Sequence, residues 1–258
     1  MKKQEKKQKQ IHIVSFSGGK DSTAMLLRML ELNMPIHYIL CADTGMEFPE
    51  MYNHISDVKI FLQKYYPKQK ITIIKSDKDF LYYMFEHKKT QGKNKGKKGY
   101  MWMDWRSRWC TSKLKQEPIQ NFYKTLEKDN DFEIIEYHGI AKDEEIRTKK
   151  NKNNKRKVVY PLVDWGWTES DALKYCYSKG FFWGGLYEYF SRLSCYLCPF
   201  QKIGELRILY YYFPNEWAYM KELDDKNIAL YNRKFRADYS IRELEEKFKK
   251  ESACKSNK

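Results

Sequence analysis

The sequence contains no apolar run approaching the roughly 20 residues that a membrane-spanning helix requires. Its basic first ten residues are not followed by the apolar stretch of a secretory signal. These two absences predict a cytoplasmic protein. Apolar residues make up only 42% of the 258 positions, but aromatic residues reach 16%, which argues against a disordered chain. This length predicts one large domain, or one domain with a small appendage.

Acidic residues are outnumbered, and the net charge is +15. The excess is concentrated in three segments of the chain, residues 1–9, 88–98 and 149–157, rather than spread along it. Lysine supplies most of the positive charge and arginine little of it, which suits diffuse attraction to phosphates better than reading of bases. Two interpretations stay open: a solvated composition rich in lysine, or contact with a nucleic acid.

The first half of the sequence alternates strand-like and helix-like segments, and the strands stop after Thr168. This order predicts an α/β fold, a doubly wound parallel sheet with helices on both faces, followed by a mostly helical C-terminal region. The expected divisions are a basic tail at 1–10, a nucleotide-binding domain at 11–165 and a helical region at 166–258. The expected strands are 11–16, 36–41, 71–75, 133–138 and 158–162, and the expected helices are 22–32, 50–65, 79–86, 118–126, 168–179, 204–213 and 240–250.

The clearest motif is the segment 15–23, Ser-Phe-Ser-Gly-Gly-Lys-Asp-Ser-Thr, between the first strand and the first helix. Two glycines allow a tight turn whose N–H groups face an anion, and the helix N-terminus adds unpaired donors and partial positive charge. Lys20 adds a full charge, and three hydroxyl groups add donors. The alternative is an ordinary glycine-rich turn with a Ser or Asp helix cap. The predicted phosphate-binding residues here are Ser15, Ser17, Gly18, Gly19, Lys20, Asp21, Ser22 and Thr23.

This segment resembles the S-G-G-x-D-[ST] loop of the PP-loop family, the N-type ATP pyrophosphatases and their relatives. The resemblance implies binding of an adenine nucleotide with Mg²⁺, with Lys20 and Asp21 as catalytic residues, and cleavage between the α and β phosphates by members that use ATP. The segment 41–50, Cys-Ala-Asp-Thr-Gly-Met-Glu-Phe-Pro-Glu, is similar to the D-T-G-x-x-F-P-E segment of phosphoadenosine phosphosulfate (PAPS) reductases. Asp43, Thr44 and Gly45 are therefore expected at the nucleotide, where Asp43 would meet a ribose hydroxyl or Mg²⁺.

Two further segments, 106–115 and 139–147, resemble the same reductase family. Ala141 stands where that family usually has an arginine, and the neighbouring Lys142 would substitute in part. The resemblance implies that Gly139 lies at the nucleotide and that basic side chains hold a sulfate or phosphate oxyanion. These expected oxyanion contacts are Arg106, Arg108, Lys113, Lys142 and Arg147.

Six cysteines remain in a chain expected in a reducing compartment, where clustered cysteines favour metal, cluster or catalytic roles. Cys195 and Cys198 form a C-x-x-C motif, and Cys110 lies in a segment that the family resemblance places near substrate. The predicted metal ligands are Cys110, Cys195 and Cys198, with Cys176 as a weaker fourth. The favoured group is a [4Fe-4S] cluster, with Zn²⁺, a dithiol switch and buried thiols as the alternatives.

Two enzyme chemistries stay open for this resemblance. PAPS reductases use a cysteine in a C-terminal E-C-G-L-H motif, and the Cys254 segment lacks the Gly and His, so reduction of PAPS competes with an ATP-dependent sulfurtransferase that thiolates or phosphorothioates a nucleic acid. A non-catalytic nucleotide-binding module is the third hypothesis. The expected partners are an adenine nucleotide, a nucleic-acid or protein acceptor and a further copy of the chain, with no membrane; the sulfur donor or reductant is not specified by the sequence.

Overall fold

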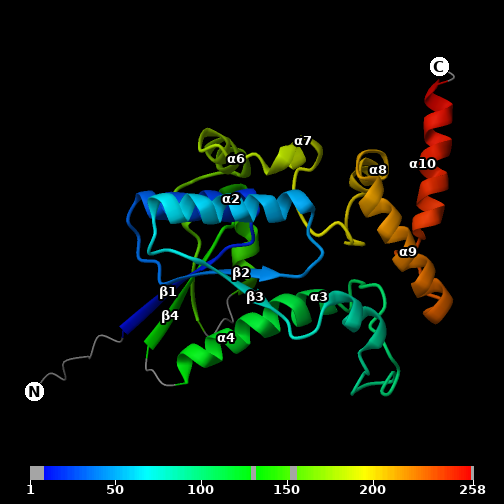
Figure 1. Cartoon of the computed structure of the whole chain (residues 1–258), viewed down its shortest axis with the longest axis horizontal. Coiled ribbons are helices and arrows are strands. Elements are labelled where there is room, and N and C mark those ends of the chain that lie inside the picture. Colours follow the sequence, from blue (N-terminus) through cyan, green and yellow to red (C-terminus); the bar gives the residue numbers. More distant parts are fainter. Residues whose placement is uncertain (1–8, 129–131, 152–155, 257–258) are drawn as a thin grey trace, which may run out of the picture. The chain divides into compact units, whose positions relative to one another are not determined.

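The computed structural model describes residues 9–128, 132–151 and 156–256 (Figure 1). They form two compact units. The sheet unit comprises the described residues within Met1–Asp43, Pro49–Lys75 and Lys115–Tyr187, and the helical unit comprises those within Thr44–Phe48, Ser76–Leu114 and Glu188–Lys258. Both units combine separated stretches of sequence, so the predicted division at residue 165 stays a prediction. Most of the predicted basic tail, residues 1–8, lies outside the described residues, and Lys9 and Gln10 begin the first strand.

The sheet unit is built on five strands in the order β3-β2-β1-β4-β5, and every pair is parallel. This arrangement confirms the predicted doubly wound α/β fold. β1 lies at the centre, where Ser15 is opposite Leu40 of β2 and His138 of β4. The order reverses between β1 and β4, and ligands of open α/β sheets bind at the carboxyl ends of strands at such a point. The strands are β1 (Lys9–Ser15), β2 (Tyr38–Asp43), β3 (Ile71–Lys75), β4 (Phe132–His138) and β5 (Lys157–Val159).

Helices cover both faces of this sheet, and Figure 1 shows α2 and α4 on opposite faces. Tyr123 of α4 packs in a cluster with Ile13, Leu40 and Ile134 from three strands, so α4 closes one face with apolar contacts. The helical segments with residues in this unit are α1 (Lys20–Glu31), α2 (Pro49–Tyr65), η2 (Ser112–Gln116), α4 (Glu117–Glu127), η3 (Lys142–Asn151), α5 (Pro161–Asp164), α6 (Glu169–Ser178), η4 (Trp183–Gly185) and α7 (Leu186–Tyr189).

α1 is buried along nearly its whole length, from Lys20 to Leu30. The helix predicted at 22–32 begins two residues earlier and ends one residue earlier than expected, at Glu31, and Leu32 is 45% exposed at its C-cap. The predicted strand at 158–162 is shorter than expected, because Pro161 begins α5 and a proline cannot donate to a sheet ladder.

The helical unit has no strand among its described residues, only an isolated antiparallel bridge between Lys88 and Lys98. Its core includes Asp224, which is 1% exposed and accepts hydrogen bonds from Trp102 Nε1 at 2.9 Å and from the Ile241 N–H at 2.7 Å. Burial raises the pKa of Asp224 to about 6. The helical segments with residues in this unit are η1 (Tyr82–Glu86), α3 (Trp109–Thr111), α8 (Ile203–Tyr212), α9 (Pro214–Tyr231) and α10 (Ile241–Ser256), besides parts of η2 and α7.

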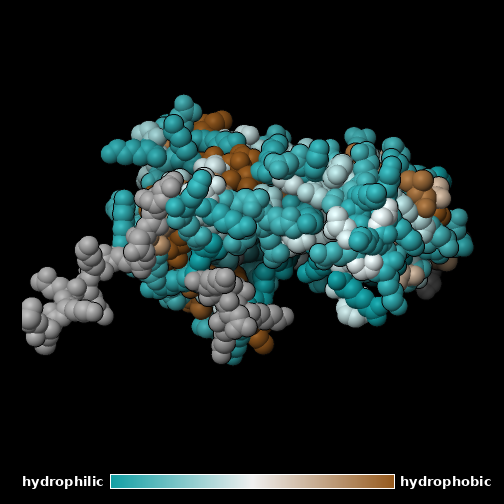
Figure 2. All heavy atoms as spheres, turned by 90° about the horizontal axis from the view of Figure 1, so that it is seen from below, coloured by the Kyte–Doolittle hydropathy of each residue, from teal (hydrophilic) through white to brown (hydrophobic). Residues whose placement is uncertain are grey.

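None of the helices in the described residues is long and apolar enough to cross a membrane. Hydrophilic residues predominate on the face shown in Figure 2, which agrees with a mean hydropathy of −0.81.

Candidate nucleotide-binding site

The segment between β1 and α1 turns sharply at Gly18, whose φ is +80°. A Cβ atom here would lie 2.8 Å from the Met51 sulfur atom, so only glycine fits both the dihedral angle and the space. The Gly18 carbonyl accepts a hydrogen bond of 2.7 Å from Trp183 Nε1, and this bond holds the turn in place. The predicted strand–loop–helix arrangement is therefore present, and Gly19 directly precedes α1.

Gly139, which follows β4, packs directly against the first turn of α1. A Cβ atom at this position would lie 2.8 Å from the backbone N and Cα of Ser22. This close approach brings the chain after β4 to the N-terminus of α1, at the reversal of the strand order. Because Gly139 has no side chain, its backbone can pack directly against the first turn of α1.

The hydroxyl groups of the segment bond mainly within the loop itself. Ser22 Oγ donates to the Gly19 carbonyl at 3.0 Å and accepts from the Ser17 N–H at 3.2 Å. Thr23 is fully buried, and its Oγ1 lies 3.0 Å from His54 Nε2. Among these hydroxyl-bearing residues Ser17 is exposed, whereas Ser22 and Thr23 are buried.

Lys20 is only 3% exposed, and its ammonium group is held by two carboxylates of the sheet unit. Its Nζ lies 2.6 Å from Glu169 Oε2 and 3.7 Å from Asp21 Oδ2. Glu169 begins α6, and its N–H donates to the Asp143 carboxylate at 3.1 Å. The ammonium group is thereby held by carboxylates from the first turns of α1 and α6.

Tyr187 contacts the same helix terminus. Its hydroxyl oxygen accepts a hydrogen bond of 2.7 Å from the Lys20 N–H, and the Lys20 ammonium lies 5.4 Å from the centre of its ring. Burial raises the pKa of Tyr187, so the hydroxyl keeps its proton at neutral pH. The hydroxyl therefore receives a bond from the helix and retains a proton to donate.

His54 of α2 supports the loop from inside the core. It is 2% exposed, and its ring stacks on Trp183 at a centroid distance of 4.2 Å. Burial lowers its pKa to about 3, so it is neutral at physiological pH. His54 links Thr23 of α1 to the Trp183 ring that holds Gly18.

Asp43 ends β2 at the carboxyl edge of the sheet, as predicted for a strand-end carboxylate. Its Oδ1 accepts from the Tyr52 hydroxyl at 2.9 Å, and its Oδ2 pairs with Lys75 Nζ at 2.8 Å. The hydrogen bond and charge of Asp43 raise the pKa of Lys75. In the helical unit, the Thr44 hydroxyl donates to Glu47 at 3.2 Å, and Gly45 adopts a φ of +77°.

The predicted oxyanion contacts fall in both units. In the sheet unit, Lys142 and Arg147 lie on η3 and pair with Glu145 and Glu144 respectively. Ala141 is fully buried. In the helical unit, the Arg106 guanidinium lies over the exposed Trp105 ring, the Arg108 guanidinium lies over the Phe200 ring, and Lys113 lines a cavity. Their common role at one oxyanion stays a prediction.

The cysteines predicted to bind a metal fall in both units. Across residues 9–128, 132–151 and 156–256, no group of three or more His, Cys, Asp or Glu side chains is arranged to hold a metal ion. Cys176 belongs to the sheet unit, where its thiol donates to the Lys20 carbonyl and burial raises its pKa, so it stays protonated. A protonated thiol is a poor metal ligand. The metal roles of Cys110, Cys195 and Cys198 stay predictions, and we derive no chemistry from a cluster or a zinc ion.

The C-x-x-C segment of the helical unit is nonetheless a well-braced turn. The Cys198 N–H bonds to the Cys195 carbonyl at 3.2 Å, and the buried Gln201 amide donates to the carbonyls of Cys195 and Tyr196. Arg236 donates to the Gln201 carbonyl at 2.9 Å. Cys110, Cys195 and Cys198 are all partly exposed in this unit.

Four residues that support the loop were not among those predicted: His54, Glu169, Trp183 and Tyr187. They come from regions of sequence distant from the glycine segment. Glu169 has one local signal, its position in the first turn of an expected helix that follows a Thr cap. The other three resemble ordinary core residues in the sequence.

The fold and the loop define a PP-loop protein of the α/β class. The sequence matches the family described as phosphoadenosine phosphosulfate reductase domain over residues 11–201, about three quarters of the chain. The chain belongs to this family.

A curated relative is the uncharacterized protein MJ0066 of Methanocaldococcus jannaschii, which is 27% identical over 215 residues. The match covers 80% of this chain and 39% of that protein, so the chain spans about two fifths of the relative's length. Among solved structures, the U34-tRNA thiolase NcsA from Methanococcus maripaludis with its [4Fe-4S] cluster matches with a TM-score of 0.40 at 14% identity. That match covers 85% of this chain and 72% of the other.

Proposed function

We propose that this chain is an enzyme that binds an adenylyl nucleotide, PAPS or ATP, with its phosphates at the N-terminus of α1, and uses it in sulfur metabolism or sulfur transfer. One observation carries the proposal: the glycine turn at Gly18 stands at the reversal of the strand order, and Gly139 packs against the helix terminus beneath it. Membership of the PAPS reductase domain family supports the choice of nucleotide.

The residues of the loop supply complementary positive potential. The first N–H groups of α1 and its dipole attract a phosphate group. The Lys20 ammonium group adds a positive charge, and Glu169 holds it in place. The Tyr187 hydroxyl accepts a hydrogen bond from the Lys20 N–H and would donate its own proton to the phosphate. Donors fixed in this way stabilise negative charge that develops on phosphate oxygens during bond cleavage, without reorganisation. Asp43 would receive a ribose hydroxyl, and Mg²⁺ would arrive with the nucleotide.

Two chemistries fit this site and differ in their products. Attack at the α phosphate of ATP would leave an adenylylated acceptor and pyrophosphate, and AMP once the acceptor is modified. Reduction of PAPS would instead break the sulfur–oxygen bond to the nucleotide and release sulfite, with electrons from an added thiol. Incubation with ATP and Mg²⁺, and separately with PAPS and dithiothreitol, distinguishes them by detection of AMP with pyrophosphate or of sulfite. Tight binding with neither product would instead identify a non-catalytic module.

The site itself is tested by a double variant, Lys20→Met with Glu169→Gln. Removing both partners of the 2.6 Å ion pair leaves neither of these two charges unpaired, and Asp21, the more distant carboxylate, is partly exposed, so the fold is preserved. Loss of a charge-assisted bond predicts a dissociation constant for ATP or PAPS that rises roughly 10- to 150-fold by isothermal titration calorimetry.

The matched control is Lys179→Met with Glu31→Gln, which removes another ion pair between α6 and α1, with an Nζ to Oε1 distance of 2.6 Å. This pair lies at the opposite ends of both helices, away from the loop. The control is expected to bind the nucleotide as the wild type does. Equal affinities of the two double variants would place the phosphates elsewhere and refute the proposed site.

A further inference from the structure

The lysine-rich segment 88–98 of the helical unit is folded as a short hairpin. The Lys89 N–H donates to the Lys97 carbonyl at 2.9 Å, and the Gly96 N–H donates to the Lys89 carbonyl at 2.8 Å. The Lys88–Lys98 bridge closes its base. Its charges are therefore attached to a defined backbone, unlike those of a solvated linker.

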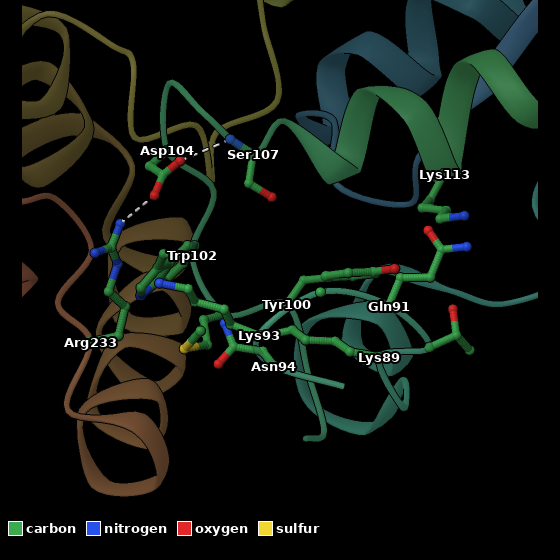
Figure 3. A pocket seen from close by; sticks show the side chains of 13 residues that line it. Lys89, Gln91, Lys93, Asn94, Tyr100, Trp102, Asp104, Ser107, Lys113 and Arg233 are labelled. Atoms are coloured by element: carbon green, nitrogen blue, oxygen red, sulfur yellow. Dashed lines mark hydrogen bonds and ion pairs between the residues drawn. The ribbon is translucent and has the colours of Figure 1, made fainter. Parts of the chain in front are cut away.

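The hairpin forms one side of a cavity of about 650 Å³ (Figure 3). Lys89 and Lys93 line it from the hairpin, Lys113 lines it from η2, and Arg233 lines it after α9. Among the described residues that line it, Asp104 is the one carboxylate, and it pairs with Arg233 at 2.9 Å. Figure 3 shows this ion pair at one end of the cavity and Lys113 with Gln91 at the other. The lining therefore carries an excess of positive charge, suited to an anion.

The wall at Tyr100 is held by an unusually constrained backbone. The Tyr100 N–H donates to the Tyr83 carbonyl at 2.9 Å, and the preceding Gly99 has no room for a Cβ atom. Met101 has a φ of +64°, a conformation that is costly for a residue with a side chain. Its carbonyl accepts from Trp109 Nε1 at 3.0 Å. Strain of this kind persists where surrounding contacts fix it, and it is common at binding sites.

A tight turn at Asp104–Ser107 forms the rim of the cavity. The Asp104 carboxylate accepts from the N–H groups of Arg106 and Ser107 at 2.9 and 2.8 Å, and both Asp104 and Ser107 line the cavity. Between them, Trp105 is 76% exposed, the highest value among the exposed large hydrophobic residues of the described chain. The Arg106 guanidinium lies 4.6 Å from its ring centre. An aromatic ring kept in water beside a cationic cavity is suited to stacking with another planar group.

We propose that this cavity and its rim bind a single-stranded polynucleotide, with a base stacked on Trp105 and the flanking phosphates at Lys89, Lys93 and Lys113. Aromatic platforms next to a cationic groove are the general means by which proteins hold single strands. An acidic peptide would use the lysines but would gain little from the ring. The role of this strand as the acceptor of sulfur rests on the proposed function, whereas its binding does not.

The environment of Lys89 supports this assignment. Burial and the nearby charge of Lys97 both lower its pKa, so its charge is less well stabilised than that of an exposed lysine. A phosphate group in the cavity would offset both effects.

The test uses fluorescence anisotropy with the full chain and labelled strands of about 12 nucleotides, as RNA and as DNA of one sequence, without nucleotide or Mg²⁺. Trp105→Ala is expected to weaken binding roughly 5- to 150-fold. For three phosphate contacts, the log–log slope of affinity against salt is expected near about −2, and Lys89→Ala or Lys93→Ala would each reduce it by about 0.7. Binding of either RNA or DNA supports the proposal, and a preference for one of them would identify the nucleic acid that serves as sulfur acceptor.

Lys95→Ala is the matched control, because Lys95 is exposed in the same hairpin but does not line the cavity. It is expected to bind nearly as the wild type does. Quenching of tryptophan fluorescence by the strand should be smaller in Trp105→Phe than in the wild type, with the remainder from Trp102 in the cavity lining, while anisotropy still reports binding. Equal losses for Lys95→Ala and Lys93→Ala, equal competition by poly-glutamate, or no binding of either strand would overturn the proposal. The Lys20→Met/Glu169→Gln variant should bind the strand normally, so failure of the nucleotide site is recognised separately.

Discussion

At the scale of single residues, the loop between β1 and α1 depends on glycines, whose lack of a side chain allows close backbone packing, as well as on its polar side chains. A Cβ atom on Gly139 would meet the backbone of Ser22 and Asp21 within 3 Å, and backbone atoms at a helix terminus have little freedom to move. The glycines of the segment 15–23 could be recognised from the sequence because they are contiguous. The role of Gly139 could be predicted only through the family resemblance, because the contact joins positions more than a hundred residues apart.

We predict that Gly139→Ala lowers the free energy of unfolding by about 1–3 kcal/mol, as overpacking does in cores. It should also weaken nucleotide binding, because the first turn of α1 must shift away from the new methyl group. Chemical denaturation and calorimetry measure the two effects. Gly204→Ala is the control, since nothing lies within 4 Å of its Cβ position in α8 and it should be neutral or slightly stabilising. Unchanged stability and affinity in Gly139→Ala would contradict the close packing.

At the scale of elements, the sequence predicted helices and strands correctly where the apolar residues of a segment follow one clear hydrophobic period. The strand at 71–75 and the helices α1, α2, α4, α6 and α8 all lie close to their predicted ranges, whereas α10 begins near its predicted start but continues six residues past the predicted end, to Ser256. α9 was missed, although it is the longest helix in the described part of the chain, because its apolar positions are interrupted by charged residues and Pro214 resembles a break. A proline is favoured in the first turn of a helix, and here it begins one. The predicted helix at 79–86 is a π-helical turn at Tyr82–Glu86.

Contacts between elements could not be predicted from the sequence pattern. Hydrophobic periodicity predicts which face of a helix is buried, but not which element packs against that face. Lys20 was expected to face a phosphate, and the structure adds Glu169 of α6 as the residue that fixes its charge. Cys176 was expected as a weak metal ligand, and the structure places it beneath α1 as a buried thiol. Both outcomes follow from the packing of α6 on α1, which no local signal specifies.

The contact among α1, α2 and η4 predicts a pH dependence. The His54 pKa is about 3 in the folded chain and near its ordinary 6.5 when unfolded, so the unfolded state binds the extra proton between these values. The His54 contribution to stability is therefore complete above pH 6.5 and declines as the pH falls toward 3, by up to about 1.4 kcal/mol per pH unit. Denaturant titrations of His54→Gln, which cannot titrate, should show a shallower slope between pH 4 and 6.5. An identical slope in wild type and variant would exclude this origin.

At the scale of the whole molecule, the helical unit contains a buried acid, Asp224. Its effect on the pH dependence of stability is opposite in sign to that of His54. Asp224 has a pKa of about 6 in the folded chain against an ordinary 3.8, so the folded state binds the extra proton between these values. Its contribution is most favourable below pH 3.8 and is lost as the pH rises through 6, a change of up to about 3 kcal/mol. Glu243 and Glu245 of α10 have pKa values lowered to about 2, so above pH 5 they stay ionised and do not obscure the change.

The two units should therefore respond in opposite directions to acid between pH 6.5 and 5. Protonation of the unfolded state at His54 weakens the sheet unit, while protonation of folded Asp224 strengthens the helical unit, so local unfolding should move toward the sheet unit as the pH falls. Hydrogen exchange followed by mass spectrometry, corrected for the intrinsic rate at each pH, measures protection in β1 and α1 against α9 and α10. His54→Gln should reduce the change in the sheet unit alone, and Asp224→Asn the change in the helical unit alone. Parallel loss of protection in both units at every pH would show that they unfold as one cooperative body and that neither buried group decides where opening begins.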